Sequence, residues 1–230
     1  AASVFNRPAV FSKSLFGGAA RFAGIATKQS AMFSNVRFAS AADFSGASFT
    51  QFADFDGARF DGDATFSRAS FIALPRTSYE DMDFPQYAYF DKVTFAQDAD
   101  FSKATFTAHV GFGMVTFARA VSFNGTSFEG AYFPGATFGQ RADFRQTSFM
   151  FVKPSFEDLE ERLQTARFSA QADPQDYLFE ARPESPHGFS CGAAELLSRT
   201  FVLPIGTVLY DPDSWDEEKQ DYTRFSEPAQ

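Results

Sequence analysis

Phenylalanine recurs along most of the chain at a spacing of five or six residues. In one stretch the rings stand at positions 95, 101, 106, 112, 117, 123 and 128, so two consecutive gaps sum to eleven. In a helix, residues eleven apart would share a face, but residues five apart would lie about 140° from each other. The intervening Gly, Ser, Thr, Asp and Asn residues are also poor helix formers. The spacing therefore excludes an amphipathic helix.

A small residue stands two positions before most of the rings, as Ala42 stands before Phe44. In extended backbone these two side chains point to the same side, and the residue between them points outward. Turn pairs such as Ser45-Gly46 follow many of the rings. A strand this short can stack on the equivalent strand one circuit later, about 4.8 Å away. The pattern predicts a solenoid in which each ring stacks on the ring below.

Three segments, "ADFSGASF", "ADFDGARF" and "ADFSKATF", resemble the A-(D/N)-(L/F)-x-x unit of the pentapeptide-repeat family. The resemblance covers roughly residues 20–150. It implies an all-β solenoid, a right-handed, four-sided β-helix with the Phe and the preceding Ala pointing inward. The chain departs from the family unit because every second unit gains one residue, so two sides take eleven residues and a circuit takes twice that number. We expect this extra residue to be absorbed at one pair of corners.

Interruptions of the repeat divide the chain. Residues 1–30 are either a basic transit-like segment or a ragged first coil, and the unit near Thr27 lacks its ring. The β-helix is expected over residues 31–150. The gap from Phe71 to Phe84 is more than twice the usual spacing, so residues 72–83 are expected to protrude as a loop. Loops on a rigid scaffold often carry contacts.

The segment after Phe149 departs from the repeat. Residues 151–170 are expected to form a capping helix, because Ser155 is a suitable N-cap and Phe156, Leu159 and Leu163 follow at helical spacing. Such a helix would cover the open end of the solenoid. Residues 171–230 are read as an acidic, extended tail that includes a short helical piece, "AAELLSR".

Composition and charge narrow the possible functions. The chain has 33 Phe but 7 Tyr and 1 Trp, so the core selects one ring shape. The net charge of −9 argues against nucleic acid as a ligand. Residues 1–42 hold 5 of the 20 basic residues and none of the 29 acids, which leaves −14 on the remainder. A single Cys excludes a disulfide framework, and no apolar run reaches the roughly 18 residues of a membrane-spanning helix.

The sequence offers no candidate catalytic, cofactor-binding or metal-binding residues. A filled solenoid has no cleft in which polar groups converge. His109 is read as a solvated corner residue, and His187 lies beside Ser190 and Cys191 in a loop without a scaffold to align them. Two scattered His and one Cys do not make a zinc site. The repeat aspartates 43, 54, 100 and 143 are read as outward, hydrogen-bonding positions. We therefore expect no enzyme and no cofactor.

Two functions remain as hypotheses. The first is a structural or accessory subunit of a larger organellar, membrane-bound complex, with other protein subunits as partners and the chain peripheral to the membrane at most. A mitochondrial location is favoured over a plastid, and the bacterial cytoplasm is the alternative. The segment "TFVLPIGTVLY" is expected to contact a partner or, equally, to pack on the solenoid itself. The partner-contact candidates are Tyr79, Phe201, Val202, Leu203, Ile205, Val208, Leu209 and Trp215.

The second hypothesis follows from the family resemblance. Some pentapeptide-repeat proteins resemble a DNA duplex in shape and charge and inhibit type II topoisomerases. The negative charge of residues 43–230 permits this function. However, "DPDSWDEEKQD" alone holds six acids, so the acids gather in the tail and form no regular ladder along the rod.

Overall fold

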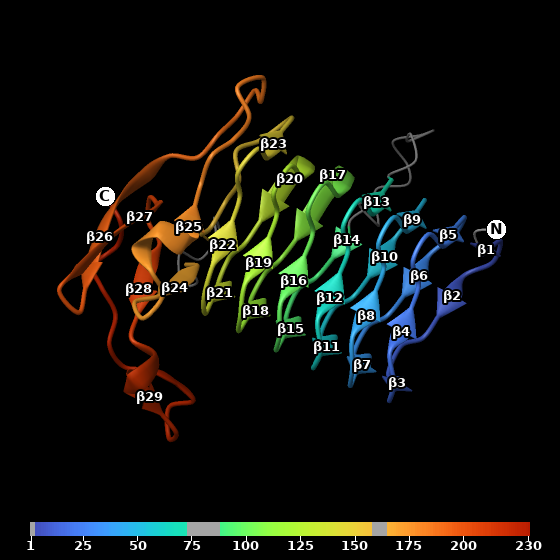
Figure 1. Ribbon diagram of the computed structural model, residues 1–230, viewed down its shortest axis with the longest axis horizontal. Coiled ribbons are helices and arrows are strands. Elements are labelled where there is room, and N and C mark those ends of the chain that lie inside the picture. The colour runs from blue at the N-terminus through green and yellow to red at the C-terminus, as the bar shows by residue number, and fades with distance from the viewer. Residues whose placement is uncertain (1–2, 73–87, 158–164) are drawn as a thin grey trace, which may run out of the picture.

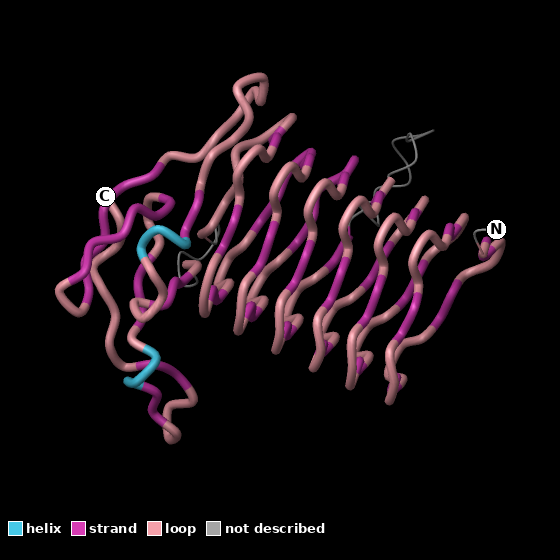
Figure 2. Tube along the Cα trace, viewed as in Figure 1, coloured by secondary structure: helices cyan, strands magenta, loops and turns pink. Residues whose placement is uncertain are grey.

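The chain winds into a parallel β-solenoid of about six turns (Figures 1 and 2). The computed structural model describes residues 3–72, 88–157 and 165–230. Each complete coil holds four short strands, one on each of four faces. After four strands the chain returns above its starting point, so that Ser70 lies opposite Ser48 of the preceding coil. This register confirms the predicted circuit of twice eleven residues.

The strands stack into four columns, which we call faces 1 to 4. Face 1 holds β1 (Val4–Phe5), β5 (Ala26–Thr27), β9 (Ser48–Phe49), β13 (Ser70–Phe71), the first parts of β17 (Thr105–Gly111) and β20 (Ser127–Tyr132), and β23 (Ser148–Phe149). Face 2 holds β2 (Ala9–Val10), β6 (Ala31–Met32), β10 (Ala53–Asp54), β14 (Ala88–Tyr89) and the second parts of β17 and β20. Face 3 holds β3 (Leu15–Phe16), β7 (Arg37–Phe38), β11 (Arg59–Phe60), β15 (Thr94–Phe95), β18 (Thr116–Phe117), β21 (Thr137–Phe138), β24 (Arg167–Ser169) and β28 (Val208–Tyr210). Face 4 holds β4 (Ala20–Arg21), β8 (Ala42–Asp43), β12 (Ala64–Thr65), β16 (Ala99–Asp100), β19 (Val121–Ser122), β22 (Ala142–Asp143) and β25 (Tyr177–Leu178).

Phenylalanine rings fill the interior in columns that follow the faces. On face 4, Phe44 and Phe66 stack with centroids 4.9 Å apart and planes 1° apart, and Phe66 and Phe101 repeat this geometry at 4.9 Å and 3°. Rings of the adjoining columns meet these edge-on, as Phe55 meets Phe66 at 5.3 Å and 89°. The stacking distance matches the spacing between strands, and a ring without a hydroxyl group leaves no buried polar atom unsatisfied. This geometry explains why the core selects Phe over Tyr.

The extra residue of every second unit lies at two of the four corners. Three residues separate Phe49 from Ala53 at the corner between faces 1 and 2, and two residues separate Phe55 from Ala58 at the next corner, where Gly57 has φ +64°. The corner between faces 3 and 4 again holds three residues. The expectation that one pair of corners absorbs the insertion is therefore confirmed.

The circuit shortens by one residue where β20 stacks on β17. The register shifts between Phe106 and His109, and from there Val110 lies opposite Ala131. Both strands continue through the corner and join faces 1 and 2 into one sheet of 11 strands. In the sequence, this shorter corner is marked by the three consecutive gaps of five residues between Phe123 and Phe138.

The insertion after Phe71 is longer than the Phe spacing suggested. Ala88 lies opposite Ala53, which makes this circuit thirteen residues longer than the regular one, and Phe90 stacks on Phe55 at 4.9 Å. The next ring in phase is thus Phe90, and the prediction that placed Phe84 there is wrong, because the strand register and not the next Phe defines the coil. The predicted loop 72–83 lies, apart from residue 72, outside the described residues.

Described residues from 3 to 30 form the first coil and the start of the second. Phe5 on face 1 lies opposite Thr27, which in turn lies opposite Phe49. Thr27 thus occupies the position of the missing ring. It is buried, and its Oγ1 has no hydrogen-bond partner among the described residues.

The predicted capping helix is wrong over the described residues, which contain no α-helix. Ser155 bridges to Tyr132, and Phe156 stacks on Phe133 at 5.1 Å, so both continue face 2. Phe168 in β24 stacks on Phe138 at 4.6 Å. Leu159 and Leu163 lie outside the described residues. Burial in the ring columns overrides the helical spacing of the local sequence.

The last sixty residues close the end of the solenoid. Strand β24, which lies just before them, and strands β25 and β28 extend faces 3 and 4. The segment read as a short helix, residues 193–199, instead forms the end of strand β26 (Cys191–Leu196), a turn and the start of β27 (Arg199–Pro204), and the two strands pair antiparallel. Two short 3-10 helices, η1 (Pro174–Asp176) and η2 (Pro212–Ser214), and a small hairpin of β29 (Trp215–Asp216) and β30 (Asp221–Tyr222) complete this region.

Candidate binding groove

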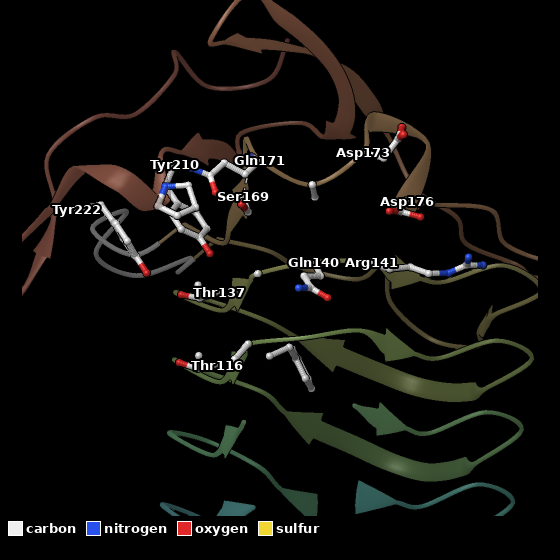
Figure 3. Close-up of a pocket in the computed structure, with 15 residues that line it drawn as sticks. Thr116, Thr137, Gln140, Arg141, Ser169, Gln171, Asp173, Asp176, Tyr210 and Tyr222 are labelled. Carbon is white, nitrogen blue, oxygen red and sulfur yellow. Dashed lines mark hydrogen bonds between the residues drawn. The ribbon is translucent and has the colours of Figure 1, made fainter. Parts of the chain in front are cut away.

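Face 3 provides a flat floor near the C-terminal end of the rod (Figure 3). Thr116 and Thr137 lie opposite each other in β18 and β21 and point outward. Small residues, Ala118 and Gly139, follow two positions later. A Cβ atom on Gly139 would lie 2.6 Å from the carbonyl oxygen of Ala118, so only glycine allows the two coils to approach this closely here.

Residues 211–225, which we call the C-terminal arm, form one wall of the groove. The arm is fixed to face 3 by an ion pair between Arg167 and Asp221 and by contact of the Tyr210 and Tyr222 rings, whose centroids are 4.3 Å apart. The Arg167 guanidinium also lies 5.5 Å from the centre of the Tyr222 ring. These contacts hold the arm as a rigid ridge that projects from the side of the solenoid (Figure 1).

The groove between floor and arm has a volume of about 630 Å³. Its other lining groups are mainly polar: Gln140, Arg141, Gln171, Asp173 and Asp176. A second hollow of about 350 Å³ lies between face 3 and the arm and includes Met114, Arg167, Asp221 and Phe225. The groove therefore combines hydrogen-bonding groups with aromatic surface, a composition that suits an extended polar ligand.

The groove contains no activated acid–base or nucleophile pair among its described residues. Burial raises the pKa of the Tyr210 hydroxyl well above its usual range, so it remains protonated and neutral. Away from the groove, burial also raises the pKa of the Cys191 thiol, which disfavours the reactive thiolate. The described part of the chain contains no group of three or more His, Cys, Asp or Glu residues that could hold a metal ion.

The outward aspartates of the repeat have a structural role, as expected. Asp43, Asp54, Asp100 and Asp143 each accept a hydrogen bond from the backbone amide two residues later, at 2.9, 2.9, 2.8 and 3.1 Å. Each carboxylate thereby stabilises the corner that follows its strand.

Two carboxylates of the repeat region, one half-buried (Asp61) and one buried (Asp143), are paired with arginine. Hydrogen bonds from Arg37 and Arg59 hold the pKa of Asp61 below its usual value. Burial acts to raise the pKa of Asp143, but hydrogen bonds from Arg145 and Arg141 lower it overall. By contrast, burial and the nearby Asp56 raise the pKa of both Asp54 and Asp91.

The partner-contact candidates are distributed over several environments. Tyr79 lies outside the described residues. Three candidates are buried in the solenoid's own closing cap: Phe201, Leu203 and Leu209. Val208 is half-buried. Three are exposed: Val202 in strand β27, Ile205 just after that strand, and Trp215 on the arm. The segment from 200 to 210 thus packs largely on its own solenoid.

The groove residues Thr116, Thr137 and Tyr222 were not among the sequence-based candidates. A Thr before the ring recurs at 94, 116 and 137, but only the strand register places these side chains in one row. No local signal indicates that the arm folds back beside that row.

In the described part of the chain, no helix is long and apolar enough to span a membrane. A family model for pentapeptide repeats, described as nine copies, matches residues 28–70 and 106–148. No curated protein and no solved structure matches the chain significantly.

Proposed function

The chain is a pentapeptide-repeat protein, and from this premise we propose that it is a non-catalytic scaffold subunit that holds a partner protein in the groove beside its C-terminal arm. Proteins of this solenoid fold are generally non-catalytic scaffolds, and pentapeptide repeats can mediate protein interactions. The observation that carries the proposal is the fixed ridge of the arm beside a flat, polar floor.

The exposed aromatic residues of the arm support a protein partner. Trp215 and Phe225 are 42% and 39% exposed, although both lie on the arm that the Arg167–Asp221 ion pair holds against face 3. Exposed Trp and other large aromatic residues are frequent anchors of protein interfaces. An extended segment of the partner would lie along Thr116 and Gln140 and cover one or both rings.

We further propose that the assembly is organellar and membrane-bound, with the mitochondrion as the first location to test. The motive is the acid-free, Arg- and Ser-containing sequence of residues 1–42. The DNA-mimic alternative receives less support, because a mimic needs free carboxylates in regular rows. Here the carboxylates of Asp61 and Asp143 are paired with arginine, and the repeat aspartates bond to their own corners.

The test is the native mass of the tagged full-length chain in its own cells, compared between two substitutions. Thr116→Arg fills the groove, whereas Thr94→Arg occupies the same strand position one coil away and outside it. Arg37 and Arg59 stand at this position in earlier coils, so arginine fits the fold. We expect a large assembly that Thr116→Arg disrupts and Thr94→Arg preserves.

Migration of the wild-type protein as a free monomer or dimer would contradict the scaffold proposal. Inhibition of topoisomerase supercoiling by the purified chain would favour the DNA-mimic alternative.

A further inference from the structure

Negative charge is concentrated on both sides of the groove. The C-terminal arm holds six acidic and two basic residues, so its net charge is −4. Across the groove from Tyr222 stands η1, with Asp173 as its N-cap and Asp176 as its last residue (Figure 3). The arm and these two aspartates together carry −6 of the chain's net charge of −9. A ligand in the groove therefore lies between two acidic walls.

Three carboxylates at these walls have no cation beside them. Asp173 and Asp176 line the groove, and Asp213 follows the lining residue Pro212 in η2. None of the three forms an ion pair with a described residue. Arg141 is the only cation among the described lining residues, and its guanidinium is directed to Asp143, at 3.2 Å. The groove thus has more negative charge than its own cations neutralise.

The arm already holds two arginines of its own chain. The Arg167 guanidinium pairs with Asp221 and lies 5.5 Å from the centre of the Tyr222 ring. Arg224 donates a hydrogen bond to the buried carboxylate of Asp211 at 2.6 Å. Carboxylates beside aromatic rings are the surroundings in which a guanidinium group is held most strongly. The carboxylates without a cation offer the same chemistry to a cation from another protein.

We propose that the partner segment held in the groove is basic, and that its Arg or Lys side chains lie between the carboxylates of η1 and those of the arm. This inference rests on the proposed function, because it names the chemistry of the segment that the groove holds. An acidic segment would be repelled by both walls. An apolar segment would leave the polar lining without hydrogen-bond partners. A basic extended segment neutralises the carboxylates, and its backbone has Thr116 and Gln140 as hydrogen-bonding partners on the floor.

The test measures how short peptides bind to the purified full-length chain, by fluorescence anisotropy. The probes are labelled Gly-Ser peptides that carry Arg, Lys, Glu or Leu at alternate positions, which face the same side in an extended chain. We expect the Arg and Lys peptides to bind, and to bind more weakly at high salt because the attraction is screened. The Glu and Leu peptides should not bind. No binding of the Arg and Lys peptides, or equally tight binding of the Leu peptide, would overturn the inference.

Two double variants separate the groove from the overall charge of the protein. Asp173→Asn combined with Asp176→Asn should weaken binding of the Arg peptide about fivefold, the loss expected for two exposed ion pairs. Asparagine remains a suitable N-cap at position 173. The matched control, Asp63→Asn combined with Glu184→Gln, removes the same charge at two exposed residues outside the groove. It should bind as the wild type does, and equal losses in the two double variants would overturn the inference.

The native mass of the chain in its own cells separates this inference from the proposed function. An assembly that Thr116→Arg disrupts, but that the Asp173 and Asp176 double variant leaves intact, would overturn the basic segment and leave the scaffold proposal standing. Loss of the assembly in both variants, with Thr94→Arg intact, would support the inference. A purified wild-type chain that dimerises, and that Thr116→Arg returns to a monomer, would assign the groove to a second copy and overturn the basic partner.

Discussion

The ring columns predict that a single truncation in the middle of the rod is severely destabilising. Phe66 is fully buried, stacks on Phe44 and Phe101 at 4.9 Å, and meets Phe55 and Phe90 edge-on at 5.3 and 5.4 Å. Removing the ring leaves a cavity that neighbouring coils cannot fill without breaking their register. We expect Phe66→Ala to lower the free energy of unfolding by about 3–5 kcal/mol.

Two comparisons separate the contributions. Phe66→Leu keeps most of the volume but loses the ring geometry, so it should cost about 1–2 kcal/mol. Phe11→Ala removes a ring that is only partly buried in the first coil, and it should cost less than Phe66→Ala. Urea unfolding followed by circular dichroism gives the three values. A cost below about 1 kcal/mol for Phe66→Ala, or one no larger than that of Phe11→Ala, would refute the column as the main source of stability.

Three further sets of substitutions test individual sites. Thr27→Val should raise the free energy of unfolding by about 1 kcal/mol, since it removes a buried hydroxyl without a partner, and thermal unfolding would show no gain if that hydroxyl were satisfied. Asp91→Asn should stabilise the protein at pH 7 and Asp143→Asn should destabilise it, because the folded-state pKa is raised at Asp91 and lowered at Asp143. As the pH falls through these pKa values, the folded protein gains stability from Asp91 and loses it from Asp143, so urea titrations of the two variants between pH 3 and 7 should diverge in opposite senses. Gly139→Ala should lower the free energy of unfolding by about 1–3 kcal/mol. Gly46→Ala should lower it by less, because the space around its Cβ is open although its φ is +61°. Equal losses in the two variants would contradict the close approach of the coils at Gly139.

The repeating part of the fold was predictable because its signal is redundant. Each coil repeats the same small residue, outward residue and ring, so one missing ring at Thr27 did not obscure the phase. The extra corner residue was likewise readable from the alternation of five- and six-residue gaps. Because many coils repeat the same pattern, one irregular position does not prevent its recognition in the sequence.

The two ends and the groove were less predictable because they depend on contacts distant in sequence. Phe156 has helical spacing to Leu159 and Leu163, but its ring belongs to the column above Phe133. Residue type alone suggested Phe84 as the next ring of the column, but the strand register makes Phe90 the ring that stacks on Phe55. The groove requires Arg167 and Asp221 to pair across 54 residues, which no local pattern encodes.

The register of the coils is the central claim, and chemical cross-linking between neighbouring coils tests it most directly. In a Cys191→Ser background, cysteines are placed at Thr94 and Thr116, which are a full circuit apart in sequence but directly opposite on face 3. The control pair is Thr116 and Ser122, which are close in sequence but lie on faces 3 and 4. A bifunctional thiol reagent with a span of about 5 Å, the spacing of paired strands, should join the first pair rapidly and the control pair slowly. Equal rates, or a faster reaction of the control pair, would contradict the solenoid.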